Sequence, residues 1–221
     1  MKHDIAFLHT AAIHKATFGE LMSELAPDLK VRHMIDESLL AEAREDGVIR
    51  RELESHIGQA MRNAASTGAA VVVCTCSTIG SPAERAGDGH MLITQRIDRA
   101  MADAAVQMGP RILIVAALNS TLAPTRALID DSAARLGLPV CCRELLVANA
   151  WSYFERSAHE KYVGTIEDAI RANIEEVDVV VLAQASMAEA GERCRSLPVP
   201  VLSSPRLGVE AAIAAYWRAR E

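Results

Sequence analysis

The stretch that decides the fold is AAVVVCTCSTIGS, residues 69–81. Its three consecutive valines, residues 71–73, are typical of a strand buried on both faces of a parallel sheet. The valines lead directly into two cysteines, two threonines, serines and a glycine. In an α/β protein the carboxyl ends of parallel strands carry the ligand-binding loops, so this stretch predicts a functional site at a strand end.

Strands and helices are predicted in alternation on both sides of this stretch. Apolar runs predict strands at residues 4–8, 30–35, 111–117, 139–146, 178–182 and 198–202. A 3.6-residue hydrophobic period predicts helices at 13–25, 48–66, 91–108, 124–136, 166–174, 188–194 and 208–218. A polar loop is expected at 36–38 and an irregular polar segment at 149–161. The alternation predicts an α/β protein whose parallel sheets are covered by helices on both faces.

The central strand has a counterpart in the second half of the chain. A second run of three valines begins at Val179, 108 residues after Val71. With this offset Cys76 corresponds to Gln184, and polar, small residues follow both strands. Shared valines would also fit two unrelated buried strands, but the common order of elements and the half-length spacing favour two related halves with strand ends facing a cleft.

Composition and charge exclude several classes of function. The chain has 221 residues and a net charge of −6, and no basic patch interleaved with aromatics, so a nucleic-acid partner is not expected. Its longest apolar runs, such as residues 112–118, are too short to span a membrane, and its first ten residues lack a signal-peptide pattern. The five cysteines are therefore expected as reduced thiols in the cytoplasm.

Four segments resemble the aspartate/glutamate/hydantoin racemase superfamily, and together they cover essentially the whole chain. They are VVVCTCST at residues 71–78, VVVLAQASM at 179–187, RILIVAALNSTLAPT at 111–125 and VRHMIDESLL at 31–40. The resemblance implies two pseudo-symmetric three-layer α/β halves with parallel sheets and with the active site in the cleft between them. The halves are then residues 1–95 with 200–221, because the C-terminal strand and helix return to the first half, and residues 96–199. A homo-oligomer is also implied.

The same resemblance implies a catalytic residue. Family members that racemise use two cysteines, one at each strand end, and no cofactor. The first position falls on Cys76, but the second falls on Gln184, whose amide does not titrate near neutral pH and cannot replace a thiol. The positions that resemble substrate-carboxylate contacts are Thr10, Ser77, Thr78, Thr121 and Ser186.

Cys76 suits acid/base chemistry beside a carboxylate. A stereocentre inverts when one group removes the α-proton and another delivers a proton to the opposite face, and a cysteine can do either. The alternative is that Cys76 packs as a small buried hydrophobe, as most free cysteines do. Cys74 is expected in the core. The remaining cysteines lack the spacing of a zinc site, so no metal is expected.

Gln184 leaves three functions open. Cys76 could work with another group, for which His9 at a strand end and His159 in the polar segment are candidates. It could act alone as a decarboxylase or lyase, or the protein could bind a small anion without chemistry. We predict a cofactor-independent, racemase-like isomerase of a small carboxylate such as an amino acid, with His9 and Gln184 among the substrate contacts. The aromatic cluster of Trp151, Tyr153 and Phe154 is expected to be a local plug or an oligomer contact.

Overall fold

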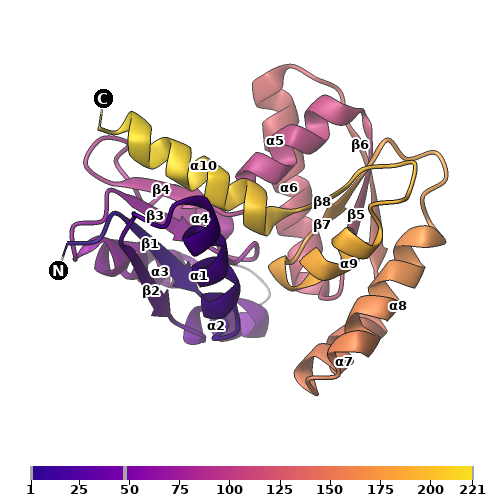
Figure 1. Cartoon of the computed structure of the whole chain (residues 1–221), viewed down its shortest axis with the longest axis horizontal. Helices are drawn as coiled ribbons and strands as arrows, with labels where there is room; N and C mark the ends of the chain where they lie inside the picture. Colours follow the sequence, from indigo (N-terminus) through magenta and orange to yellow (C-terminus); the bar gives the residue numbers. More distant parts are fainter. Residues whose placement is uncertain (1, 47–48, 221) are drawn as a thin grey trace. The chain divides into compact units, whose positions relative to one another are not determined.

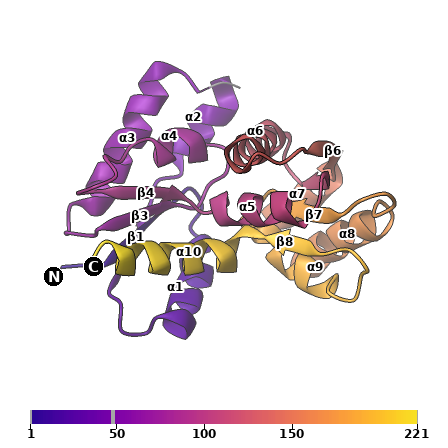
Figure 2. The ribbon, with the colours of Figure 1, turned by 90° about the horizontal axis from the view of Figure 1, so that it is seen from above.

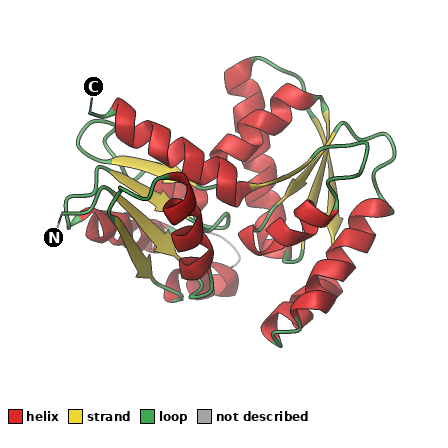
Figure 3. Ribbon diagram, in the orientation of Figure 1, coloured by secondary structure: helices red, strands yellow, loops and turns green. Residues whose placement is uncertain are grey.

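The computed structural model describes residues 2–46 and 49–220 (Figure 1). The chain divides into two units, Met1–Asp98 with Pro205–Glu221, and Arg99–Ser204. Each unit holds a four-stranded parallel sheet, and strands alternate with helices along the chain (Figure 3). The predicted α/β class with two parallel-sheet halves is therefore confirmed.

The sheet of the first unit has the strand order β2-β1-β3-β4. Its strands are β1 (Ile5–His9), β2 (Val31–Ile35), β3 (Val71–Cys74) and β4 (Ile93–Arg96). Its helices are α1 (His14–Leu25), α2 (Ser38–Asp46), α3 (Arg51–Ala65), α4 (Gly80–Glu84) and α10 (Ser204–Arg218), the last of which begins at the boundary between the units.

Helical layers bury both faces of this sheet. Figure 2 shows α3 and α4 on one face of the sheet and α1 and α10 on the other. On the α3 face, Leu8 and Val72 belong to one apolar cluster with Leu53 and Ile57 of α3. On the opposite face, the ring of Phe7 stacks on a phenylalanine of α1 with ring centroids 5.5 Å apart. Burial on both faces is the reason for the unbroken valine run, since a fully buried valine contributes about 1.5–3 kcal/mol.

The second unit repeats this topology. Its strands are β5 (Arg111–Ala116), β6 (Cys141–Leu146), β7 (Val179–Leu182) and β8 (Val201–Ser203), in the order β6-β5-β7-β8. Its helices are α5 (Arg99–Met108), α6 (Asn119–Leu136), α7 (Ala148–Glu155), α8 (His159–Arg171), the 3₁₀ helix η1 (Ala185–Met187) and α9 (Ala188–Arg193). The order of pairing is the same as in the first unit, with the first and third strands of each unit at the centre.

The backbone pairing places the ends of β3 and β7 in the same register. The N–H of Thr75 donates to the carbonyl of Leu8 at 3.0 Å, and the N–H of Ala183 donates to the carbonyl of Val115 at 2.9 Å. The next residue is Cys76 in the first unit and Gln184 in the second. The pairing therefore supports the correspondence of these two residues that the valine runs indicate.

The single helix predicted at residues 91–108 is wrong. The segment forms β4 and then α5, because Ile93 donates to the carbonyl of Ala70 and Ile97 donates to the carbonyl of Cys74, which joins it to β3. Before β4, one carboxylate oxygen of Asp88 accepts the N–H groups of residues 90, 91 and 92 and fixes a tight loop. The apolar spacing of Ile97 and the following helix hid this short strand.

The irregular segment predicted at residues 149–161 is also wrong. It contains α7 and the start of α8, separated at Ser157, whose φ is 56°. Trp151 stacks on Phe154 with ring centroids 4.6 Å apart, and both pack against the core of the second unit. The aromatic side chains provide the apolar face that these otherwise polar helices need.

Several helix starts also differ from the prediction. Ser38, expected in a loop, is the first residue of α2, and α6 begins at Asn119 instead of Pro124. Pro124 thus lies inside α6, where it lacks the N–H that would otherwise donate to the carbonyl of Ser120, so the helix continues through it with one hydrogen bond fewer. No helix within residues 2–46 and 49–220 combines the length and the apolar character that a membrane span requires.

Candidate active site at the ends of β1 and β3

Cys76 lies two residues beyond β3, in the turn that leads into α4. It is 8% exposed, whereas Cys74 is fully buried. The thiol of Cys74 donates to the carbonyl of Cys76 at 3.7 Å, and burial raises the pKa of the Cys74 thiol far above its usual value. Cys74 therefore stays protonated in the core, and of these two residues only Cys76 has any exposed surface.

The turn leaves backbone donors without partners. Among the described residues, the N–H groups of Thr10, Cys76 and Thr78 make no hydrogen bond. Thr78 also has a buried hydroxyl oxygen without a partner. Because β1 and β3 are neighbouring parallel strands, their carboxyl ends bring these groups to one edge of the sheet. Free N–H groups in such a turn can bind an anion such as a carboxylate.

A buried ion pair lies behind the turn and was not identified from the sequence. Nε of Arg96 donates to Oδ1 of Asp98 at 2.6 Å, and Nη2 of Arg96 donates to Oδ2 of Asp98 at 3.0 Å. Nη2 also lies 3.3 Å from the carbonyl oxygen of Ser77, and the Ser77 hydroxyl bonds to the Asp98 carboxylate. The sequence signal that could have indicated this ion pair is the spacing of two residues, which places Arg96 and Asp98 on one face of an extended segment.

His9 is held inside the unit by both of its ring nitrogens. Nδ1 lies 2.9 Å from Oγ1 of Thr75, and Nε2 lies 2.8 Å from Nδ1 of His33. The Thr75 hydroxyl donates to the Leu8 carbonyl, so His9 donates through Nδ1 and accepts from His33 at Nε2. Burial, followed by the nearby His33 and His14, lowers the pKa of His9 to about 3, so its ring is neutral near pH 7.

His9 and Cys76 lie on opposite sides of the sheet. The ring of His9 stacks on Phe7 and on Phe18 of α1, whereas Cys76 belongs to the cluster packed against α3. The structure therefore brings His9 together with Thr75, next to Cys76 in sequence, and not with the thiol itself.

In the second unit, the side chain of Gln184 occupies its own strand end. Its Oε1 accepts the N–H groups of Ala117 at 2.7 Å and Leu118 at 3.1 Å, and the residue is 8% exposed. These two bonds fix the orientation of the amide. Nε2 of Gln184 has no hydrogen-bond partner within the described part of the chain, so it is the atom that can donate to a ligand.

The other candidates of the second unit already have partners inside it. The hydroxyl of Thr121 donates to the carbonyl of Leu118 at 2.8 Å, within the first turn of α6. The oxygen of Ser186 lies 2.8 Å from the hydroxyl of Tyr162, a buried residue whose pKa is raised to about 12, chiefly by that burial. His159 is the first residue of α8 and pairs with Glu189 at 2.5 Å on the surface.

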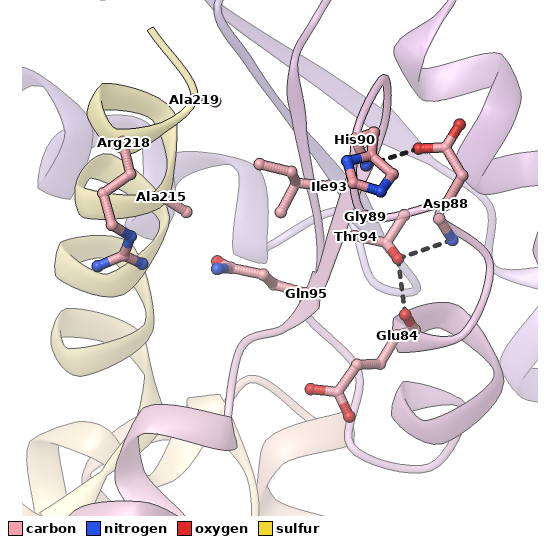
Figure 4. Close-up of a pocket in the computed structure, with 11 residues that line it drawn as sticks. Glu84, Asp88, Gly89, His90, Ile93, Thr94, Gln95, Ala215, Arg218 and Ala219 are labelled. Carbon is pink, nitrogen blue, oxygen red and sulfur yellow. Dashed lines mark hydrogen bonds between the residues drawn. The ribbon is translucent and has the colours of Figure 1, made fainter. Parts of the chain in front are cut away.

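A large polar hollow lies elsewhere in the first unit. This pocket has a volume of about 770 Å³. Figure 4 shows that it lies between β4, the preceding loop and the end of α10. Gln95 extends from β4 toward α10, where Ala215, Arg218 and Ala219 line the opposite wall. No residue of the turn at 75–80 lines this pocket. Across the described residues, no group of three or more His, Cys, Asp or Glu side chains is arranged to hold a metal ion.

Comparison with solved structures gives matches over the whole chain. Aspartate racemase of Picrophilus torridus is 16% identical with a TM-score of 0.71, and the match covers 98% of this chain and 98% of that one. A glutamate racemase isoform from Bacillus anthracis is 12% identical with a TM-score of 0.72, over 98% and 82% of the two chains. A mutant arylmalonate decarboxylase in a sulfate-associated form is 17% identical with a TM-score of 0.58, over 97% and 93%.

These matches show that the chain shares its fold with an aspartate racemase, a glutamate racemase and an arylmalonate decarboxylase, as the sequence resemblance predicts. No protein-family model and no curated protein matches the sequence. At 12–17% identity the likeness shows the shared fold, and the chemistry has to be argued from this chain's own residues.

Proposed function

We propose that the protein is a cofactor-independent enzyme that moves the α-proton of a small carboxylate, with Cys76 as the acid/base or nucleophile. The observation that carries the proposal is the turn after β3, where Cys76, a residue that is 8% exposed, lies among N–H groups that make no hydrogen bond in the described part of the chain. A thiolate can accept the α-proton and the thiol can return it, while N–H donors stabilise the negative charge on the substrate carboxylate as the proton leaves.

The proposed carboxylate contacts come from both units. In the first unit they are the backbone N–H groups of Thr10, Cys76 and Thr78, together with the side-chain hydroxyls of Thr10 and Thr78. Ser77 and His9 are already bonded within the unit, and we assign them to holding the turn and the end of β1. In the second unit Nε2 of Gln184 is the proposed donor, and Thr121 and Ser186 stay as weaker candidates because their hydroxyls have partners.

Isotope exchange tests this proposal. The protein is incubated in D₂O with a panel of small carboxylates, including both enantiomers of aspartate, glutamate and lactate, and deuterium at the α-carbon is measured by mass spectrometry. We expect incorporation with the wild type and with Cys74→Ala, and a loss of about 10²–10⁴-fold with Cys76→Ala. Equal exchange by Cys76→Ala and the wild type would exclude Cys76 as the acid/base.

A decarboxylase is the second candidate, because one strand end carries a thiol and the other an amide. Loss of CO₂ from a substituted malonate leaves its electron pair as an enediolate, and the Cys76 thiol would then deliver the single proton that completes the product. The fold match to arylmalonate decarboxylase makes this reaction worth testing. CO₂ release by the wild type and not by Cys76→Ala, without exchange in D₂O, would favour it. Thermal stabilisation by a carboxylate without any turnover would instead indicate a binding protein.

A further inference from the structure

The Arg96–Asp98 pair contacts the Cys76 turn at three places. Arg96 donates to the carbonyl oxygen of Ser77, and Asp98 accepts the hydroxyl of the same residue. At Gly80 the turn lies directly on the guanidinium, since a Cβ there would be 2.8 Å from Nε of Arg96. The residue that follows Cys76 is thus held by its carbonyl and its side chain, and the end of the turn rests on the same cation.

The pair is itself anchored to the sheet. Ile97, between the two charged residues, donates its N–H to the carbonyl of Cys74 at 2.9 Å. Helix α10 packs against the same residue at Gly208, where a Cβ would lie 2.1 Å from the carbonyl oxygen of Ile97. The Arg96–Asp98 segment therefore has little freedom to shift, and it transfers this rigidity to the turn.

Stability alone does not account for a charged pair at this place. The side chain of Arg96 is 3% exposed and that of Asp98 is 1% exposed. Removing two charges from water costs several kcal/mol for each ion, so an apolar pair of similar size is often equally stable or more stable. What the apolar pair would lack is directed hydrogen bonding to the turn.

We propose that Arg96 and Asp98 are positioning residues for Cys76, which hold the turn so that the thiol and its neighbouring N–H groups keep one geometry. The inference rests on the proposed function, in which Cys76 reacts and the pair acts only through the turn. A displacement of about 1 Å at a reacting group can lower a rate by about 100-fold, so a loosened turn affects turnover more than folding.

The decisive variant replaces both charges at once, Arg96→Met with Asp98→Leu. Removing one partner alone would leave a buried charge unpaired and destabilise the fold, whereas the apolar pair avoids this. Amide hydrogen exchange of the peptide covering residues 75–80 reports on the turn through the hydrogen-bonded N–H groups of Thr75 and Gly80. The thermal unfolding midpoint reports on the fold, and kcat and KM for deuterium exchange report on Cys76.

We expect an unfolding midpoint close to that of the wild type, with the turn exchanging about tenfold faster while peptides from β1 and β5 are unchanged. The kcat should fall by about 100-fold while KM changes by less than about threefold. The matched control is Arg135→Met with Asp103→Leu, which removes the pair that joins α6 and α5. It should leave both the exchange of the turn and kcat unchanged.

Unchanged turn exchange and unchanged kcat in a folded double variant would overturn the inference. If that variant does not fold, Arg96→Lys decides the matter, because lysine keeps the charge but not the planar fork and should loosen the turn selectively. If Arg96→Lys instead lowered protection from hydrogen exchange equally throughout the fold, the pair would serve only to stabilise the fold. Failure of the proposed function is separate, since the wild type would then exchange no substrate while the turn still responds to the substitutions.

Discussion

The ends of β3 and β7 share a backbone arrangement and differ in the side chain that follows each strand. After β3 the chain carries Cys76, and the N–H groups around it are open. After β7 it carries Gln184, whose amide oxygen accepts the N–H groups of Ala117 and Leu118. The strand register makes Ala117 the counterpart of Thr10, whose N–H is free. The N–H that makes no hydrogen bond at Thr10 is thus matched in the second unit by the N–H of Ala117, which a side chain binds.

The preceding strands extend the comparison. β1 ends in His9, whose ring is bonded to Thr75 and His33, whereas the register places Ala116 at the corresponding end of β5. The first strand end therefore contains a titratable group and a thiol, and the second contains neither. The two units therefore share a backbone frame and differ in the side chains at their strand ends, and under the proposed function these side chains decide which end is reactive.

The largest effect is expected when the first end is made to copy the second. Cys76→Gln removes the proposed acid/base and should lower α-deuterium incorporation by about 10²–10⁴-fold. Cys74→Ala is the control, because its thiol is buried in the same strand and kept protonated. If Cys76→Gln exchanged deuterium at the wild-type rate, the thiol could not be the functional difference between the two strand ends.

The next effect concerns stability at the second end. Gln184→Met leaves the N–H groups of Ala117 and Leu118 without their acceptor, and should lower the free energy of unfolding by about 1–3 kcal/mol. Gln184→Glu keeps an oxygen at this position and is the matched control. Urea denaturation followed by circular dichroism measures both. A Gln184→Met variant as stable as Gln184→Glu would show that the amide bonds are not structural.

The free energy of unfolding should also depend on pH through His9 at the first strand end, by an amount similar to the previous effect. The folded pKa of His9 is about 3, below its ordinary value of 6.5, so the unfolded chain takes up a proton that the folded chain does not. Stability from this group is present above pH 6.5 and is lost as the pH falls. It should decrease by about 2 kcal/mol between pH 7 and pH 5.

Urea denaturation at both pH values tests this contribution. His14 and His33 also have lowered pKa values because of burial, so they add to the loss with the same sign. The His9→Gln variant should lose about 2 kcal/mol less than the wild type between these pH values. His56→Gln, at an exposed histidine of α3, should behave as the wild type. If His9→Gln and the wild type lost the same unfolding free energy between these pH values, His9 would not be the group responsible.

The smallest expected effect comes from giving the second end a thiol. The resemblance implies that racemising relatives use one cysteine at each strand end, so Gln184→Cys should raise racemisation of an exchanged substrate by about tenfold or more. Gln184→Ser, which lacks a group that titrates near neutral pH, is the control. A folded Gln184→Cys protein no more active than Gln184→Ser would contradict the correspondence of the two ends.

The sequence predicted the central strands well because their signals are local. Runs of valine and hydroxyl residues at strand ends identified β3, β7 and Cys76 without tertiary information. The short strand β4 escaped prediction because Ile93 and Ile97 continue the apolar pattern of α5, and only pairing with β3 makes the segment a strand. Helix α7 escaped because its apolar side chains are aromatic rings among polar residues.

The position of Cys76 at a strand end was predictable from the sequence, whereas the contacts that hold its turn were not. The valine run places Cys76 just after a buried strand, and its catalytic role, which the family resemblance implies, stays a prediction. The Arg96–Asp98 pair depends on β4, and the bond between His9 and His33 depends on the pairing of β1 with β2. The occupation of the second strand end by Gln184 is likewise a tertiary contact, although the sequence did indicate that the amide cannot act as a thiol.

The most direct test compares two alkylating reagents on the same protein. Iodoacetate carries a carboxylate and iodoacetamide does not, and peptide mapping gives the rate of each at Cys76 and at the exposed Cys141. If Cys76 lies beside open carboxylate donors, its ratio of iodoacetate to iodoacetamide rates should exceed that of Cys141 by about tenfold, equivalent to about 1.4 kcal/mol. Equal ratios, or a lower ratio at Cys76, would contradict the account.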